Sequence, residues 1–270
     1  MADAELTAER VSIGYGRRPV VEGLSLAIPR GRFTALLGPN GSGKSTLLRG
    51  LAGLHRLERG AVLLDGQPLA RLPAKAVARR IGFLAQGATA PEGMTVGDLV
   101  RQGRYPHRSL LGGWTAADSA AVAEALTLTG TADLRDRRLD TLSGGQRQRA
   151  WIAMTLAQQG GILLLDEPTT WLDLAHQVEL LELLRHLIET RGATVVAVLH
   201  ELNQAARYAD HLVLLKAGRI HAEGPPAAVL TADNMQAVFG LAVTILTDPE
   251  TGGPMCVPLR RPHVPQDGGR

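Results

Sequence analysis

One stretch of the chain combines glycines, a lysine and a hydroxyl in an order that suits phosphate binding. The residues are Gly38, Pro39, Asn40, Gly41, Ser42, Gly43, Lys44 and Ser45, followed by Thr46. Glycines let backbone N–H groups approach phosphate oxygens closely. Lys44 could then reach the β- and γ-phosphates, and the Ser45 hydroxyl could ligate Mg²⁺. The alternative is a glycine-rich turn that happens to contain a lysine, which a preceding strand and a following helix would disfavour.

A pair of carboxylates follows a short apolar run much later in the chain. Asp166 and Glu167 come directly after Ile162–Leu165, which reads as a buried strand. Ligands of open α/β sheets bind at the carboxyl ends of such strands. We expect Asp166 to hold Mg²⁺ through its water shell and Glu167 to polarise the attacking water as general base. Acidic residues that merely decorate the surface at a strand end are the competing interpretation.

A second anion-binding helix start is predicted after Leu142. The residues Ser143, Gly144, Gly145 and Gln146 combine an N-cap serine with two glycines at the start of a long helical segment. Free backbone N–H groups at such a helix end can bind an anion. Because the first glycine-rich loop already covers one side of a γ-phosphate, this second helix end makes sense if it closes over a nucleotide held by another copy. An ordinary capped helix remains the alternative.

Three further residues stand at the ends of predicted strands or in a turn. Gln86 could touch Mg²⁺ or the attacking water, and His200 could hydrogen-bond the γ-phosphate or orient Glu167. Tyr15, between two glycines, could stack on adenine. Each signal is weak alone, since a glutamine is usually on the surface, a histidine structural and a tyrosine part of the packing. Their order along the chain strengthens all of them.

The composition limits the possible functions. The chain has 270 residues, 45% of them hydrophobic, and a net charge of +3. The small charge and the aromatic content of 3% argue against nucleic-acid binding. Cys256 is the single cysteine, so no internal disulfide can form. No apolar run approaches the roughly 18 residues that span a bilayer, so a partner must supply the spans of any membrane process.

The elements that must position these residues alternate between strands and helices. Apolar alternation predicts strands at Val11–Ile13, Leu24–Ile28, Ala61–Leu64, Phe33–Leu37, Ile81–Leu84, Ile162–Leu165 and Ala193–Leu199, with a hairpin at Leu212–Lys216 and Arg219–Ala222. Helices are predicted at Lys44–Leu54, Val96–Gly103, Ala116–Thr127, Gly130–Arg135, Gln146–Gln158 and Leu174–Arg191, with a short helical segment from Pro225. The alternation in the second half requires a parallel sheet with right-handed crossovers.

These elements predict an α/β fold with a parallel sheet core, a small N-terminal antiparallel β subdomain and an inserted α-helical subdomain. We place one nucleotide-binding domain over residues 1–248, with the helical insertion at about 87–158. The proline- and glycine-rich tail, residues 249–270, is expected to be loosely structured.

In this order the motifs resemble those of the nucleotide-binding domains of ABC transporters over nearly the whole chain. In that family they are the Walker A loop, the Q-loop at Gln86, the signature motif, the Walker B strand, a D-loop at Leu172-Asp173 and an H-loop at His200. The resemblance implies a P-loop NTPase fold with a RecA-like core, bound ATP and Mg²⁺, and a head-to-tail dimer in which Lys44 faces Ser143 and Gly145 of the other copy. It also implies transmembrane permease partners, an indirect link to a substrate-binding protein, and a peripheral position on the cytoplasmic face of the cell (inner) membrane.

Three longer strings are similar to the ATPases of importers for iron–siderophore complexes, whose relatives import haem and cobalamin. They run over residues 169–179, 200–210 and 103–107; Trp171 departs from the usual Tyr or Phe. Exporter and non-transport ABC ATPases are the alternatives, although the chain lacks the coiled-coil insertions, zinc cysteines and tandem cassettes typical of the latter. The likeness also suggests a permease groove near Gln86 and Met94–Arg108. There Leu99, Val100 and Tyr105 would give an apolar contact rimmed by Arg101, Arg104 and Arg108, unless they form an internal face of the lobe.

Overall fold

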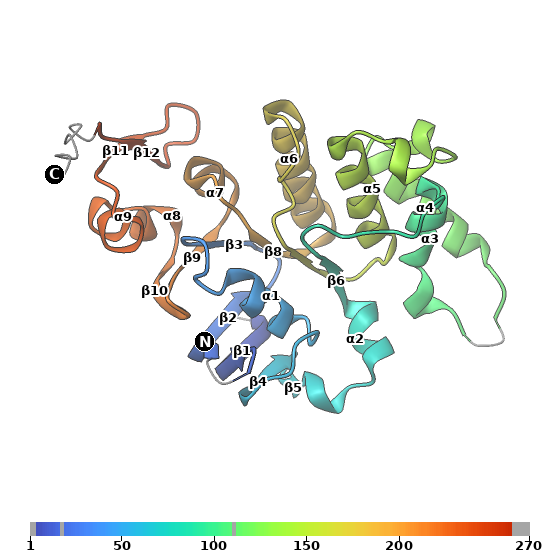
Figure 1. Ribbon diagram of the computed structural model, residues 1–270, viewed down its shortest axis with the longest axis horizontal. Helices are drawn as coiled ribbons and strands as arrows, with labels where there is room; N and C mark the ends of the chain where they lie inside the picture. The colour runs from blue at the N-terminus through green and yellow to red at the C-terminus, as the bar shows by residue number, and fades with distance from the viewer. Residues whose placement is uncertain (1–3, 17–18, 110–111, 261–270) are drawn as a thin grey trace, which may run out of the picture.

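The computed structural model describes residues 4–16, 19–109 and 112–260, and a six-stranded sheet forms its centre (Figure 1). The strand order is β10 (Arg219–Gly224), β9 (His211–Lys216), β3 (Phe33–Leu37), β8 (Thr194–Val198), β7 (Ile162–Leu165) and β6 (Ile81–Leu84). All neighbours pair in parallel except β9 and β10, which form an antiparallel hairpin. The carboxyl ends of β3, β6, β7 and β8 therefore lie at one edge of the sheet.

The parallel strands are apolar throughout because both faces of the sheet are covered. Alternate residues face opposite sides: in β7, Leu163 and Leu165 belong to one hydrophobic cluster, and Ile162 and Leu164 to the other. The first cluster is completed by α6 (Leu174–Arg191), α7 (Leu202–Tyr208), α8 (Pro226–Val229) and α9 (Ala232–Phe239).

The second cluster lies between the central sheet, helix α1 (Lys44–Leu51) and a smaller antiparallel sheet. That sheet has the order β2 (Pro19–Pro29), β1 (Ala4–Gly14), β4 (Arg59–Leu64) and β5 (Gln67–Pro68). Helix α2 (Ala74–Arg80) connects it to β6. The antiparallel sheet thus covers this side of the core and packs against α1.

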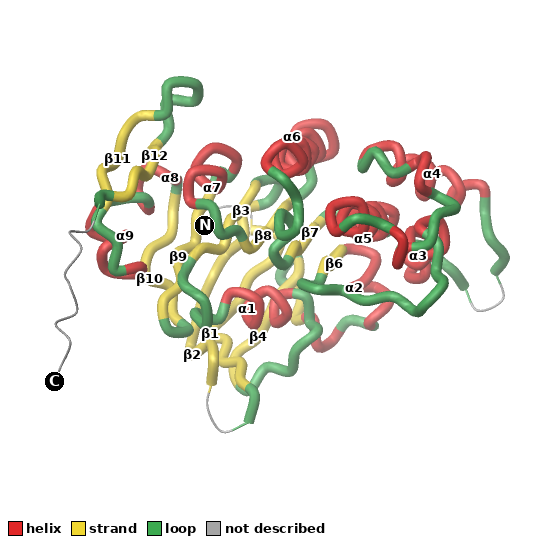
Figure 2. Tube along the Cα trace, turned by 45° about the horizontal axis from the view of Figure 1, so that its top comes forward, coloured by secondary structure: helices red, strands yellow, loops and turns green. Residues whose placement is uncertain are grey.

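A helical lobe projects beyond β6, at the right of Figures 1 and 2. It consists of α3 (Val96–Gln102), α4 (Ala116–Leu128) and α5 (Gly144–Ala157), which share their own apolar cluster. Each helix starts with a capping box, led by Thr95, Thr115 and Ser143 respectively. Inside the lobe, the guanidinium of Arg104 donates to Asp118 over 2.9 Å, with both side chains nearly inaccessible.

The predicted α/β fold with an antiparallel sheet and a helical insertion is confirmed, and most strand and helix ends differ by only a few residues. Gly130–Arg135, predicted as a helix, contains only a 3₁₀ turn at Ala132–Leu134. The short elements α2, α7 and β5 were missed. Helix α2 has no buried residue, so its sequence lacks the apolar periodicity that reveals longer helices.

The prediction of a loose tail is wrong for its first part. Strand β12 (Pro254–Pro258) pairs in antiparallel register with β11 (Val243–Thr247), and the hairpin packs on α7. The prolines stand at the two ends of β12, where they are tolerated. The side chain of Asn203 on α7 binds both the N–H and the carbonyl of Cys256, which fixes the hairpin. Residues 261–270 of the predicted tail lie outside the described residues.

In the part of the chain that the structure describes, no helix is both long and apolar enough to cross a membrane.

Candidate functional site

The predicted site residues follow four neighbouring parallel strands. The glycine-rich loop follows β3, Asp166 and Glu167 follow β7, His200 lies just beyond β8, and Gln86 just beyond β6. Because these strands run in the same direction, their carboxyl ends bring the four segments to one edge of the sheet. Side-chain contacts join these residues into two adjoining groups: Ser45 binds Asp166, and Gln86 and His200 bind Glu167.

The glycine-rich loop turns tightly between β3 and α1. Gly38 has φ of +145°, and a Cβ there would lie 2.3 Å from the Leu215 carbonyl oxygen, so only glycine fits. Gly43, at φ +99°, precedes the first residue of α1, Lys44. The Lys44 ammonium donates to the carbonyls of Gly38 and Pro39 over 2.8 and 3.0 Å. Burial lowers the pKa of Lys44, while the charges of Glu167 and Asp166 oppose that shift.

Asp166 is buried against the start of α1. Its Oδ1 accepts a hydrogen bond of 2.7 Å from the Ser45 hydroxyl. Its Oδ2 has no hydrogen-bond partner among the described residues, and a nitrogen of Arg49 lies 4.0 Å away. Burial raises the pKa of this carboxyl, against the effects of Ser45 and Arg49.

The donor set at Asp166 fits Mg²⁺. A hydroxyl oxygen and a carboxylate oxygen are the hard ligands that this ion prefers. A buried carboxylate oxygen left without a partner is costly unless something else binds it. Ser45 and Asp166 are therefore suited to hold the ion directly or through its water.

Glu167 is held at both carboxylate oxygens. Its Oε1 lies 2.8 Å from Nε2 of His200, and its Oε2 accepts from the side-chain amide of Gln86 over 2.8 Å. Oε2 also accepts from the Thr170 hydroxyl at 3.2 Å. The Glu167 backbone has φ of +53°, a left-handed conformation that non-glycine residues seldom adopt. Such geometry is typical of residues whose orientation matters to a site.

The second helix start has the predicted cap but lies apart from these contacts. The Ser143 hydroxyl accepts from the Gln146 N–H, and the Gln146 side chain accepts from the Ser143 N–H, both over 3.2 Å. Gly144 and Gly145 face the loop before α6: added Cβ atoms would lie 3.4 Å from side-chain atoms of Trp171 and Leu172. Within one chain this helix end therefore adjoins the loop that follows Glu167.

Tyr15 and Asp173 also lie apart from the contacts around Asp166 and Glu167. The exposed Tyr15 ring packs on the His55 ring, with their centroids 4.6 Å apart. Nε2 of His55 lies 3.0 Å from the Gly14 carbonyl oxygen. The turn that contains Tyr15 leads into β2, and a Cβ at Gly43 would touch Val21 at the start of that strand. Asp173 is the N-cap of α6, and its carboxylate accepts from the N–H and the ring of His176.

The suggested permease groove is wrong for Leu99, Val100 and Arg104. Leu99 and Val100 are at most 2% exposed and belong to the core of the helical lobe. The guanidinium of Arg104 donates hydrogen bonds to Asp118, to the Ala157 carbonyl and to the side chain of Gln159. An internal face, which the sequence left open, explains these three residues. Tyr105 is well exposed, and with Arg101 and Arg108 it lines a hollow of about 410 Å³.

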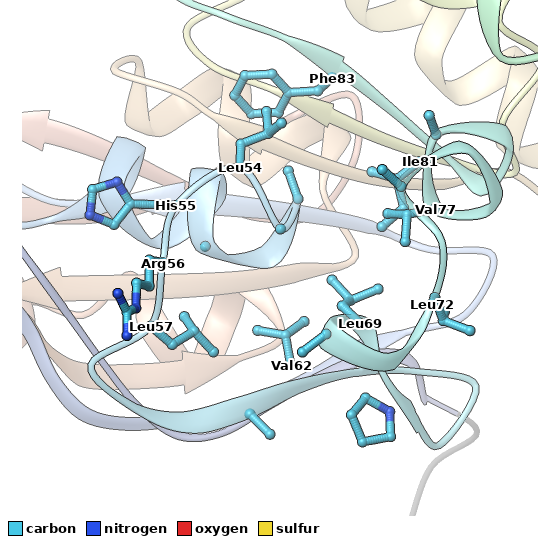
Figure 3. A pocket seen from close by; sticks show the side chains of 18 of the residues that line it. Leu54, His55, Arg56, Leu57, Val62, Leu69, Leu72, Val77, Ile81 and Phe83 are labelled. Atoms are coloured by element: carbon cyan, nitrogen blue, oxygen red, sulfur yellow. The ribbon is translucent and has the colours of Figure 1, made fainter.

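A larger, apolar hollow lies on the other side of β6. It is a pocket of about 730 Å³ between α1, α2 and the antiparallel sheet. Figure 3 shows Leu54 and Phe83 at one end, with Leu57, Val62 and Leu69 along the opposite wall. Leu54 is 62% exposed. Phe83 belongs to β6, the strand that leads to Gln86.

Sequence reasoning missed several residues around Glu167. Thr170 binds its carboxylate, and the amides of Gln148 and Gln177 bind backbone carbonyls of the following loop. Thr170 could have been suspected, because it follows the predicted general base by three residues. The glutamines carry no signal by themselves, since their roles depend on how α5 and α6 pack against the loop.

Comparison with known proteins gives consistent matches. A family model described as "ABC transporter" matches residues 21–170. The ferric enterobactin transport ATP-binding protein FepC of Escherichia coli (strain K12) is 53% identical over 258 residues, covering 96% of this chain and 95% of that protein. The probable siderophore transport system ATP-binding protein YusV of Bacillus subtilis (strain 168) is 51% identical over 261 residues, covering 97% of this chain and 95% of that protein.

Solved structures are similar over most of the chain as well. A metal-chelate type ABC transporter in an inward-facing conformation superposes with a TM-score of 0.81 at 32% identity, covering 96% of this chain and 98% of that one. The dimeric ATP-binding cassette MJ0796, in a post-hydrolysis state bound to ADP and Pi, gives a TM-score of 0.73 at 28% identity, covering 82% and 98%.

Proposed function

Because this chain belongs to the family of ABC transporter ATP-binding subunits, we propose that it hydrolyses ATP to drive the import of iron–siderophore complexes. The ATPase activity is that of the family. The observation that supports the cargo is the 53% identity to FepC over nearly the full length of both chains. Nothing in the described site is shaped for a siderophore, so the cargo would be bound by partner proteins and not by this subunit.

We assign the hydrolytic roles from the geometry around Glu167. Its carboxylate, held by His200 and Gln86, is placed to accept a proton from an attacking water. The glycine-rich loop and Lys44 would bind the β- and γ-phosphates once ATP draws the ammonium away from the Gly38 and Pro39 carbonyls. Ser45 and Asp166 would hold Mg²⁺, which when bound neutralises phosphate charge. The ring of Tyr15 would stack on adenine.

The second helix start supports a paired arrangement. Beside the Ser143 cap, Gly144 and Gly145 offer N–H groups at the start of α5, yet they adjoin Trp171 and Leu172 and not the phosphate loop of their own chain. We assign them, with Gln146 and Asp173, to a nucleotide held by a second copy in a head-to-tail dimer. The dimeric state of the similar cassette with ADP and Pi favours this assignment.

A permease would complete the transporter at the cytoplasmic face of the membrane. We place its contact at the apolar pocket between Leu54 and Phe83, in place of the helical-lobe residues that are buried. Strand β6 carries Phe83 on the pocket wall and leads directly to Gln86, which binds Glu167. A helix seated in the pocket could therefore influence the catalytic carboxylate through a single short strand.

The hydrolytic assignment is tested by Glu167→Gln. This variant keeps the size of the side chain and removes the base, so we expect nucleotide binding to persist while turnover falls by about 10²-fold or more. A nucleotide-dependent dimer should also accumulate, measured by size-exclusion chromatography with ATP. Turnover at the wild-type rate would remove Glu167 from the mechanism.

The cargo is tested by growth of a strain lacking this subunit on ferric siderophores, with haem and cobalamin as controls. Loss of growth on ferric siderophores alone supports the proposal. Loss on haem or cobalamin alone would assign the subunit to one of those importers. Co-purification of a partner of about ten membrane spans would further separate an importer from an exporter.

A further inference from the structure

The loop that follows Glu167 has an unusual backbone. Glu167 and Trp171 both adopt left-handed φ values, +53° and +69°, although neither is glycine. Two turns close the loop: the Thr170 N–H donates to the Glu167 carbonyl, and the Leu172 N–H donates to the Thr169 carbonyl. Non-glycine residues in this conformation persist only when their surroundings hold them there.

The side chain of Gln177 supplies such a hold. Its amide, one turn inside α6, donates to the Leu172 carbonyl over 3.0 Å and to the Thr169 carbonyl at 3.4 Å. These carbonyls flank Trp171 on both sides. Gln148 on α5 adds a bond of 3.1 Å to the Pro168 carbonyl. The loop is thus tied to helices on two sides, and Gln177 binds the part with the left-handed tryptophan.

Gln177 is in turn connected to the other side of Glu167. Its Oε1 accepts a hydrogen bond of 2.8 Å from the side-chain amide of Gln204 on α7. Helix α7 starts two residues after His200, whose ring binds Glu167. The Oε1 of Gln204 is buried without a partner among the described residues, so the bond to Gln177 is what orients this amide.

The two glutamines come from the two longest strings that resemble siderophore importers, residues 169–179 and 200–210. The resemblance identified both strings but assigned no role to their glutamines. In the fold, α6 and α7 lie side by side and bring Gln177 and Gln204 together.

We propose that Gln177 is a positioning residue for the catalytic carboxylate, and that Gln204 couples it to the helix that follows His200. Gln177 holds the loop whose backbone sets the direction of the Glu167 side chain. Gln204 links that loop, through Gln177, to the helix that follows His200. The proposal rests on the assignment of Glu167 as general base. Neither glutamine touches nucleotide in this scheme, so their effect falls on the chemical step and not on ATP binding.

The test is steady-state ATP hydrolysis by the full-length chain carrying Gln177→Leu, Gln204→Leu or both. Since misplacing a catalytic group by about 1 Å can cost 10²-fold, we expect Gln177→Leu to lower kcat by about tenfold or more with KM for ATP nearly unchanged. Gln204→Leu should lower kcat less, and it should add nothing when Gln177 is already leucine. The exposed Gln236 on α9 provides a matched control, and Gln236→Leu should leave kcat unchanged.

Unchanged kcat in Gln177→Leu, a rise in KM that accounts for the whole loss, or strictly additive effects of the two substitutions would each overturn the proposal. Thermal unfolding separates positioning from folding: the variants should keep a transition close to that of the wild type. If Gln177→Leu does not fold, Gln204→Leu decides the question alone by its kcat. Glu167→Gln, measured beside them, reports on the base itself, so a failed positioning role and a failed general base give different results.

Discussion

The Nε2 atom of His200 lies 2.8 Å from Oε1 of Glu167. This contact joins the ends of β8 and β7, which are neighbours in the central sheet. Gln86, beyond the end of β6, binds the second oxygen of the same carboxylate. Residues beyond the ends of three adjacent strands therefore meet at the Glu167 carboxylate.

His200→Ala should strongly reduce turnover. The variant removes the partner of Oε1 and leaves Gln86 on Oε2, so the carboxylate can rotate away from the attacking water. We expect kcat to fall by about 10²-fold with little change in nucleotide affinity, measured by fluorescent-nucleotide titration. Gln86→Ala is the companion variant, because it removes the partner of the other oxygen. Full activity in His200→Ala would show that the contact is not needed for turnover.

Ser143→Ala should act on both stability and paired function. The Ser143 hydroxyl caps α5, and loss of such a cap costs about 1 kcal/mol of the free energy of unfolding. Denaturant titration measures that cost in the isolated chain. If Ser143 also contacts nucleotide across a dimer, the variant should weaken ATP-dependent dimerisation. Thr231→Ala, which removes the cap of α9, is the control: it should destabilise the fold similarly and leave dimerisation intact.

The buried pair of Arg104 and Asp118 predicts a pH-dependent contribution to stability. The Thr115 hydroxyl and then Arg104 hold the pKa of Asp118 at about 2. Since this is below the value of about 3.9 for an unfolded aspartate, the ionised carboxylate stabilises the fold above about pH 4. That contribution decreases as the pH falls toward 2, where the folded carboxyl also takes up a proton.

Asp118→Asn isolates this effect. At pH 7 it should lower the free energy of unfolding by about 3 kcal/mol, because it leaves Arg104 buried without its anion. The difference from the wild type should shrink between pH 4 and pH 2 in urea titrations. A difference that stays constant over this range would mean that the ionised carboxylate is not its source.

Cys256 offers a probe of the C-terminal hairpin. Burial raises the pKa of its thiol, and the side chain is only 4% exposed, so alkylation of the folded protein at pH 8 should be slow. Asn203→Ala removes two hydrogen bonds of about 1 kcal/mol each from the Cys256 backbone and should speed labelling about tenfold or more. Asn234→Ala, on α9, serves as the control. Rapid labelling of the wild type would instead indicate a loosely held hairpin.

The sequence predicted best what depends on local patterns. Phe33–Leu37, Ile81–Leu84 and Ile162–Leu165 were placed to the residue, because short aliphatic runs between turn residues have few other uses. The N-cap at Ser143 followed from a serine and two adjacent glycines, whereas the reciprocal bond of Gln146 emerged only from the structure. These features depend on residues that are neighbours in the chain, so the sequence alone reveals them.

What it missed depends on packing between distant segments. Leu99 and Val100 look alike whether they face a partner or the core of the lobe, and only the positions of α4 and α5 decide the question. Gln177 and Gln204 are ordinary helix glutamines until α6 and α7 meet. The tail was misjudged for the same reason, since the partner that orders Cys256 is Asn203, far earlier in the chain.

The order of the strands has a consequence for biosynthesis. Strand β3, which ends at the glycine-rich loop, pairs on one side with β8 and on the other with β9, so both of its neighbours come from residues 194–216. While the ribosome is still making the first two thirds of the chain, β3 has no strand to pair with. Such distant pairing is slow to form. The nascent chain should therefore acquire its affinity for ATP late, after β9 has emerged. Nucleotide present during translation would bind and stabilise only nearly complete chains.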